Sequence, residues 1–159
     1  MKVKDCMTKD VVTVRRSTTL KELITLFKKH NFHTIPVIEE DRTLAGIVNF
    51  EDMLKTFQPY GANVARILNT IPLLLLNDDV EEDLVLSEIS GEMGVLVLTD
   101  DLMNRNFVTV SEETEIKDAR ALMRVNKVNV VPVLKDNKLV GVISLFDIIY
   151  MIFKEKGLI

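Results

Sequence analysis

An internal repeat constrains the fold of this chain more than any other feature of its sequence. Residues 132–149 contain two short apolar runs joined by a polar turn, and a helix is predicted after the second run. Residues 36–54 show the same design. Three pairs of identical residues set the register, at spacings of 96, 96 and 95 residues: Met7 with Met103, Pro36 with Pro132, and Gly46 with Gly141. The chain is therefore a duplicated unit that has lost one residue in a turn, where loop length is least constrained.

The first repeat predicts the element order β-α-β-β-α. Residues 11–14 form a short β-branched run, which we expect to be a strand. Residues 20–30 carry apolar side chains at helical spacing, and Thr19 with Glu22 has the spacing of a capping box at the start of that helix. Two further strands and a second helix are predicted at residues 35–38, at residues 44–48 and from Phe50.

The second repeat predicts the same order with weaker capping, because Glu115 stands where the first repeat has Thr19. Gly46 and Gly141 are interpreted as strand positions that allow a close backbone approach. The expected fold class is thus α/β, more specifically α+β, built from two tandem β-α-β-β-α repeats. The side chains expected to face inward from the two helices of the second repeat are Ile116, Ala119, Leu122, Met123, Leu145, Ile148, Ile149 and Ile152.

The expected domain boundaries are residues 1–57 for the first repeat, 58–100 for a connecting segment and 101–159 for the second repeat. The connecting segment is too long for a simple linker, which predicts structure or function of its own. Within it the sequence predicts a helix, then an acidic turn, then either a strand or a buried extended arm, at residues 64–71, 77–83 and 95–98.

Composition excludes several classes of protein. A net charge of −4 and a pI near 5.3 argue against a general nucleic-acid binder. The longest apolar run, residues 71–76, is far too short to span a bilayer, and the N-terminus lacks the apolar stretch of a secretory signal. Cys6 is the only cysteine, so no intramolecular disulfide can form and a reducing compartment fits best. We therefore expect a cytoplasmic protein that binds neither nucleic acid nor a membrane.

Three motifs occur in the same order in both repeats. A segment of the form Met-x-x-x-apolar-Val-Thr-Val opens each one, at residues 7–14 and 103–110. An apolar-Pro-Val triplet precedes each predicted hairpin turn. Each hairpin then ends in Gly-apolar-apolar-Asn/Ser-x-x-Asp, at residues 46–52 and 141–147. In this ordered set of motifs the chain resembles a tandem pair of cystathionine-β-synthase-type (CBS) domains.

The resemblance covers residues 3–57 and 99–153 and implies a pseudo-twofold pair of repeats with two clefts between them. The ligand that it implies is an adenine nucleotide (AMP, ADP or ATP) or S-adenosylmethionine. The implied role is that of a non-enzymatic module that signals energy or metabolite state to a regulated protein, and the implied assembly is a homodimer. The alternative is a constitutive dimerisation module that binds no ligand. The sequence contains no recognisable catalytic motif.

Each implied cleft is composite, since it combines a ribose-binding carboxylate from one repeat with segments of the other. One cleft would use Ser144 and Asp147, lined by Val142, and the residues implied to face them are Lys9, Asp10, Val11, Val12, Phe32, His33 and Thr34. The other would use Ile47, Asn49 and Asp52, faced by Arg105, Asn106, Phe107, Val108, Val128, Asn129 and Val130. A carboxylate can accept both ribose hydroxyls, while Lys9, His33 and Arg105 are candidates for phosphate contacts.

Simpler interpretations of the same residues stay open. Asp52 and Asp147 have the position of helix caps, which need no ligand. His33 is either a phosphate contact or a polar residue at a strand edge. Asn49 departs from the Ser or Thr common at that position in the family, so the Asp147 cleft is the stronger candidate. Cys6 and the two histidines have no zinc-ligand spacing, and no metal site is expected.

Overall fold

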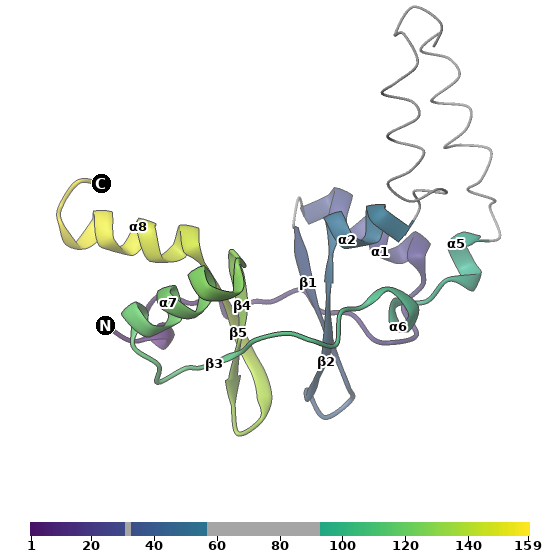
Figure 1. The fold of residues 1–159 in the computed structure, drawn as a ribbon, viewed down its shortest axis with the longest axis horizontal. Helices are drawn as coiled ribbons and strands as arrows, with labels where there is room; N and C mark the ends of the chain where they lie inside the picture. Colours follow the sequence, from purple (N-terminus) through teal and green to yellow (C-terminus); the bar gives the residue numbers. More distant parts are fainter. Residues whose placement is uncertain (31–32, 57–92) are drawn as a thin grey trace, which may run out of the picture. The chain divides into compact units, whose positions relative to one another are not determined.

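The computed structural model describes residues 1–30, 33–56 and 93–159 of the chain (Figure 1). The described residues form two compact units that interleave along the sequence. Unit 1 comprises Met1–Arg16, Thr34–Ile47 and Asn104–Ile159, and unit 2 comprises Ser17–His33 and Val48–Met103. The helix predicted at residues 64–71, the acidic turn at 77–83 and Phe32 lie outside the described residues.

A three-stranded sheet organises the second repeat within unit 1. Its strands are β3 (Val110–Ser111), β4 (Val130–Lys135) and β5 (Lys138–Ser144), in the order β3-β4-β5 (Figure 1). β3 pairs parallel with β4, and β4 pairs antiparallel with β5. Asp136 and Asn137, between β4 and β5, both have positive φ, which matches the geometry of a tight two-residue hairpin turn.

Helices α7 (Ile116–Asn126) and α8 (Leu145–Glu155) complete this repeat. The core that they share with the sheet is formed by Val3, Val110, Ile116, Ala119, Met123, Val131, Val133, Ile143 and Ile148. Most of the predicted inward positions are confirmed, with Leu122, Leu145 and Ile152 partly buried against the core. Ile149 is an exception, because it is 45% exposed. The apolar surface of α8 is therefore wider than the face that the core covers.

The N-terminal segment, residues 1–8, also belongs to this core. Its short 3-10 helix η1 (Val3–Asp5) places Val3 in the core with none of its surface exposed. The Val3 N–H donates to the carbonyl of Thr114 (2.9 Å), and the Lys4 N–H donates to that of Glu112 (3.0 Å). The segment that opens the first repeat is thus built into the core of the second.

The same segment extends the outer edge of β5. Thr8 and Val142 exchange two backbone hydrogen bonds, each of 2.9 Å. A Cβ added to Gly141 would lie 2.8 Å from the Thr8 carbonyl oxygen and 2.9 Å from Met7 Sδ. The interpretation of Gly141 as a site of close backbone approach is confirmed.

The first repeat contributes a hairpin of β1 (Thr34–Ile38) and β2 (Leu44–Asn49). Only Val14 of the expected strand at residues 11–14 pairs with this hairpin, as a parallel bridge to Val37. The strand prediction was wrong for the other three residues, because their backbone groups pair with no strand that the structure describes, and β-branching alone cannot supply a partner.

Unit 2 contains α1 (Leu20–His30), α2 (Phe50–Thr56), α5 (Met93–Leu96) and α6 (Thr99–Leu102). The capping box of α1 is confirmed: the Thr19 N–H donates to Glu22 Oε2 (2.8 Å), and the Glu22 N–H donates to Thr19 Oγ1 (3.4 Å). Phe27 of α1 meets Phe50 of α2 edge-on, with ring centroids 5.6 Å apart.

Residues 95–98 form neither the strand nor the buried arm expected of them. Val95 and Leu96 lie in α5 and are 57% and 72% exposed. Leu98 then forms an isolated bridge to Thr19, and the buried Thr99 donates its N–H and its hydroxyl to the Thr18 carbonyl, both at 2.8 Å. These contacts duplicate those of Lys2 and Val3 with the second repeat. The contacts of Leu98 and Thr99 with Thr19 and Thr18 determine the path of the chain at residues 95–99. The apolar character of residues 95–98 alone does not predict that path.

Candidate functional site

The start of α8 brings together the two side chains that head the first predicted cleft. Ser144 is the N-cap, and its Oγ accepts a hydrogen bond from the Asp147 N–H (3.1 Å). In return Asp147 Oδ2 accepts from the Ser144 N–H (2.8 Å) and from the Ser144 hydroxyl (2.6 Å). The helix-cap interpretation is thereby confirmed as a local structural role. It fixes the orientation of the carboxylate.

The capping hydrogen bonds from Ser144 use only one of the two carboxylate oxygens of Asp147. Both bonds from Ser144 end on Oδ2, and Asp147 Oδ1 accepts no hydrogen bond from any residue that the structure describes. The side chain is half-buried. A carboxylate oxygen has two lone pairs, so a rigidly held Oδ1 can accept hydrogen bonds from a ligand hydroxyl without breaking the cap. Capping and ligand binding by Asp147 are therefore compatible.

The N-terminal segment supplies a neighbour of Asp147 that the sequence did not reveal. Burial raises the pKa of the Cys6 thiol, and the nearby Asp147 carboxylate raises that pKa further. Thr8, two residues after Cys6, pairs with Val142, which lies five residues before Asp147 on the strand that leads into α8. Repeat spacing alone gives no sign that the opening residues of the first repeat lie against the second repeat, so it did not predict Cys6 as a neighbour of Asp147.

The other residues predicted for this cleft come from both units. Lys9 and Asp10 follow the Thr8 bridge and are exposed, whereas Val11 and Val12 are half-buried. Thr34 is half-buried at the start of β1. His33 belongs to unit 2, where its imidazole is 72% exposed and its Nδ1 lies 3.4 Å from Glu51 Oε1. That these residues contact one and the same ligand stays a prediction.

The equivalent carboxylate in the first repeat has different chemistry. Asn49 stands in place of Ser144, and its Nδ2 donates to Asp52 Oδ2 at 3.0 Å. Glu51, exposed and acidic, occupies the position that Phe146 holds in the second repeat. The Asp52 site thus carries a second negative charge nearby, which disfavours an anionic ligand relative to the Asp147 site.

The residues expected to face Asp52 lie in unit 1. Asn104 exchanges two backbone hydrogen bonds with Ile47 of β2 (3.0 and 2.8 Å), and Arg105 is the next residue along the chain. Arg105 and Asn106 are exposed, and Phe107 and Val108 are half-buried. Val128, Asn129 and Val130 precede and begin β4, where Val130 pairs with Ser144 and the Asn129 carbonyl accepts from the Leu145 N–H (2.8 Å). Their contact with an Asp52-bound ligand stays a prediction.

Residues 1–30, 33–56 and 93–159 contain no group of three or more Cys, His, Asp or Glu side chains that could hold a metal ion. The helices described within those ranges include none with the length and apolarity needed to cross a bilayer.

A comparison with known families identifies the repeats. The CBS domain model matches residues 3–58 and again residues 99–154. The chain belongs to the CBS domain family. A CBS relative is the uncharacterized protein MJ1426 of Methanocaldococcus jannaschii, which is 30% identical over 152 residues, or 94% of this chain and 89% of that protein. The inosine-5'-monophosphate dehydrogenase of the same organism is 24% identical over 149 residues, but the match covers only 23% of that enzyme.

Solved structures share the CBS fold over nearly the whole chain. CBSX2, solved in complex with AMP, has a TM-score of 0.70 and 23% identity, with 98% of each chain covered. The CBS domain pair of protein MJ0100, solved with 5'-methylthioadenosine and S-adenosyl-L-methionine, has a TM-score of 0.67 and 20% identity, again with 98% of each chain covered. The fold prediction, two CBS repeats of the α+β class, is confirmed.

Proposed function

We propose that this protein is a non-enzymatic regulatory module that binds an adenosyl ligand, either AMP, ADP, ATP or S-adenosylmethionine, and signals metabolite state to a partner protein. The observation that carries the proposal is the Ser144–Asp147 pair, in which a fixed carboxylate keeps one oxygen open to ribose hydroxyls. The AMP bound by CBSX2, and the two adenosyl compounds bound by MJ0100, support the ligand class.

The structure of unit 1 suggests how a ligand would act. Asp147 sits at the start of α8, while the N-terminal segment is hydrogen-bonded to β5 through Thr8 and Val142. A ligand that contacts both Asp147 and the residues after Thr8 would stabilise those positions of α8 and of the N-terminal segment in which both contacts are made. It would shift the population of α8 positions only as far as its affinities for those positions differ. Because Asp147 lies in the first turn of α8, a ligand that binds its carboxylate also constrains the position of that helix.

Isothermal titration calorimetry tests the proposal. The full chain is titrated separately with AMP, ADP, ATP and S-adenosylmethionine, up to millimolar concentration. We expect saturable heat with at least one of the four compounds. Guanosine monophosphate serves as the control for the base. The absence of heat with all four adenosyl compounds would refute the proposal.

A variant of Asp147 separates ligand binding from capping. Asp147→Asn keeps an oxygen that can accept from the Ser144 N–H but removes the negative charge offered to ribose hydroxyls. We expect about 2 kcal/mol weaker binding, or roughly thirtyfold in Kd, with a melting temperature close to that of the wild type. Asp52→Asn is the matched control and should change the affinity of the stronger site little. Equal affinities for wild type and Asp147→Asn would leave Asp147 as a cap alone.

The second candidate function is a constitutive dimerisation module without a ligand. The observation that favours it is the outer face of α8, where Phe146, Ile149, Tyr150 and Phe153 are 72%, 45%, 49% and 45% exposed at helical spacing. We propose a cytoplasmic homodimer under either function. Light scattering with and without nucleotide distinguishes a dimer that the ligand switches from one that forms regardless.

A further inference from the structure

A single arginine joins the hairpins of the two repeats within unit 1. Arg42 lies in the turn between β1 and β2, and its Nε and Nη2 both donate to the Leu139 carbonyl of β5, at 3.2 and 3.1 Å. In return the Leu139 N–H donates to the Arg42 carbonyl (3.0 Å), and Thr43 forms an antiparallel bridge with Lys138 beside it. These three hydrogen bonds, the Arg42–Leu139 contact, connect residues that lie 97 positions apart in the sequence.

The backbone of Arg42 has a conformation that arginine rarely adopts. Its φ is 70°, in the left-handed region, and the turn is held by the Thr43 N–H, which donates to Asp41 Oδ1 (3.0 Å). At the 95-residue spacing that relates the two repeats after the turn, the equivalent residue is Asn137, whose φ is 62°. Asparagine is enriched in this region of φ and arginine is not. The geometry of the turn therefore does not explain an arginine here, whereas the bonds to Leu139 do.

The second repeat does not return this contact from its own turn. The Asn137 side chain makes no hydrogen bond with any residue that the structure describes. The side-chain connection between the two hairpin turns therefore depends on Arg42. Because a non-glycine residue with positive φ persists only where its surroundings hold it there, such residues often have a functional role.

Strand β5 connects this contact to the start of α8. Leu139 is the second residue of β5 and Ser144 is its last, and Ser144 caps α8 through its hydrogen bonds with Asp147. The Leu139 side chain is 1% exposed, so the interior of the protein holds it in place. At about 3.4 Å per residue, the distance along the strand from Leu139 to Ser144 is roughly 17 Å. No loop lies between the Arg42–Leu139 contact and the helix cap.

We propose that Arg42 is the residue through which the first repeat responds to a ligand at Asp147. The inference rests on the proposed binding of an adenosyl ligand at that carboxylate. A ligand that fixes the start of α8 also fixes the end of β5, and the Arg42–Leu139 contact makes the β1–β2 hairpin move with β5. The contact strengthens ligand binding in turn, because coupling between two sites is reciprocal. Arg42 acts as a positioning residue and not as a ligand contact.

Hydrogen exchange of the full chain without ligand tests the contact itself. Arg42→Asn installs the residue that the second repeat has at the equivalent position, so the turn keeps its φ while both guanidinium bonds are lost. We expect exchange of the Leu139 N–H to become about tenfold faster, together with that of the β1–β2 amides. Arg42→Lys keeps the charge and a donor and should restore part of the protection, which an effect of turn geometry alone would not do.

The matched control is Arg16→Asn. Arg16 also binds this hairpin, since its Nε lies 2.6 Å from Glu39 Oε1, but this ion pair lies within the first repeat and both side chains are exposed. Exchange of the Leu139 N–H should stay within about twofold of the wild type in this variant. Circular dichroism checks that all three variants fold.

Calorimetry with AMP, ADP, ATP and S-adenosylmethionine tests the response to ligand. The compound that binds the wild type most tightly should bind Arg42→Asn about fivefold more weakly, and Arg16→Asn within about twofold of the wild type. The same compound should slow exchange of the β1–β2 amides in the wild type but not in Arg42→Asn.

The results separate this inference from the proposed function. Absence of heat when the wild type is titrated with all four compounds would refute the proposed function, and the inference with it. Binding to the wild type, with equal affinity and equal β1–β2 protection in Arg42→Asn, would overturn the inference alone. Unchanged exchange of the Leu139 N–H in ligand-free Arg42→Asn would also overturn it.

Discussion

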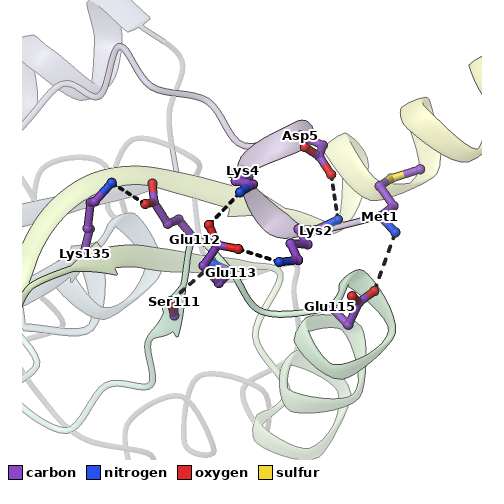
Figure 2. Close-up of polar contacts among 9 residues, drawn as sticks. All are labelled: Met1, Lys2, Lys4, Asp5, Ser111, Glu112, Glu113, Glu115 and Lys135. Atoms are coloured by element: carbon purple, nitrogen blue, oxygen red, sulfur yellow. Dashed lines mark hydrogen bonds and ion pairs between the residues drawn. The ribbon is translucent and has the colours of Figure 1, made fainter.

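At the scale of single residues, Glu113 links the N-terminal segment to the second repeat. Its two carboxylate oxygens accept hydrogen bonds from Lys2 Nζ (2.5 Å) and Lys4 Nζ (2.6 Å), as Figure 2 shows. Nearby, Lys135 pairs with Glu112 at 2.6 Å, and the N-terminal ammonium lies 3.5 Å from Glu115 (Figure 2). The hydrogen bonds from Lys2 and Lys4 lower the pKa of Glu113 from 4.5 to about 2.

This shift predicts a pH dependence of stability. Because the pKa of Glu113 is lower in the folded state than in the unfolded state, its ionised form stabilises the fold above about pH 4.5. The contribution declines as the pH falls from about 4.5 toward 2. We expect Glu113→Gln to lower the urea midpoint at pH 7 and to have a smaller effect at pH 3. Because the side chains are exposed, the effect should be modest.

The control for this measurement is Glu40→Gln, which changes an exposed glutamate that has no partner among the described residues. Its difference from the wild type should be small at both pH values. A Glu113→Gln effect that is the same at pH 7 and pH 3 would contradict the assigned role of the two lysines.

At the scale of elements, the start of α7 is the clearest opportunity for stabilisation. Its N-cap, Glu115, makes no side-chain capping bond, whereas Thr19 caps the equivalent helix α1 through its hydroxyl. Asp118 already occupies the position that Glu22 holds in the first repeat. We predict that Glu115→Thr raises the free energy of unfolding by about 0.5–1 kcal/mol, measured by urea denaturation at neutral pH.

Thr19→Ala is the opposite test and should cost about 1 kcal/mol at α1. The exposed ion pair between Glu115 and the N-terminus offsets little of the expected gain, since such pairs contribute weakly. A Glu115→Thr variant less stable than the wild type would show that this ion pair matters more than the missing cap.

The elements also show what local sequence can predict. Helices with a complete amphipathic period and a capping box, such as α1, were predicted at their observed bounds. The run at residues 11–14 predicts a strand, but among the described strands only Val14 forms a bridge, to Val37 of β1. The run at 95–98 was equally apolar and yet begins in a helix. Short apolar runs take their structure from tertiary partners, which the sequence does not specify.

At the scale of the whole molecule, each repeat is completed by the opening segment of the other. Val3 enters the core of the second repeat, and Thr99 binds the Thr18 carbonyl of the first. Thr8 pairs with Val142, and Asn104 pairs with Ile47 in the same way. The repeat spacing alone did not predict this exchange, because a duplication does not say which copy a segment contacts. For the same reason Cys6 was missed as a neighbour of Asp147. The composite clefts implied by the CBS resemblance did place residues 9–12 opposite Asp147.

This exchange predicts that the N-terminus is structurally essential, although chain ends commonly fray. Val3→Ala should lower the free energy of unfolding by about 2 kcal/mol, because it removes two methyl groups from a fully buried position. Hydrogen exchange should show the loss of protection in α7 and in β4–β5 of the second repeat. Val125→Ala, at a valine 76% exposed on α7, is the matched control and should have little effect. Equal stability of Val3→Ala and the wild type would contradict the assigned packing.

The most direct test of the central claim is a crystal structure of the full chain with the adenosyl compound that binds most tightly. The account predicts that the ribose hydroxyls donate to Asp147 Oδ1 while Oδ2 keeps its bonds to Ser144. It also predicts that the Asp147 site fills before the Asp52 site, where Asn49 and Glu51 alter the chemistry. A ligand bound away from both carboxylates, or bound only at Asp52, would contradict it.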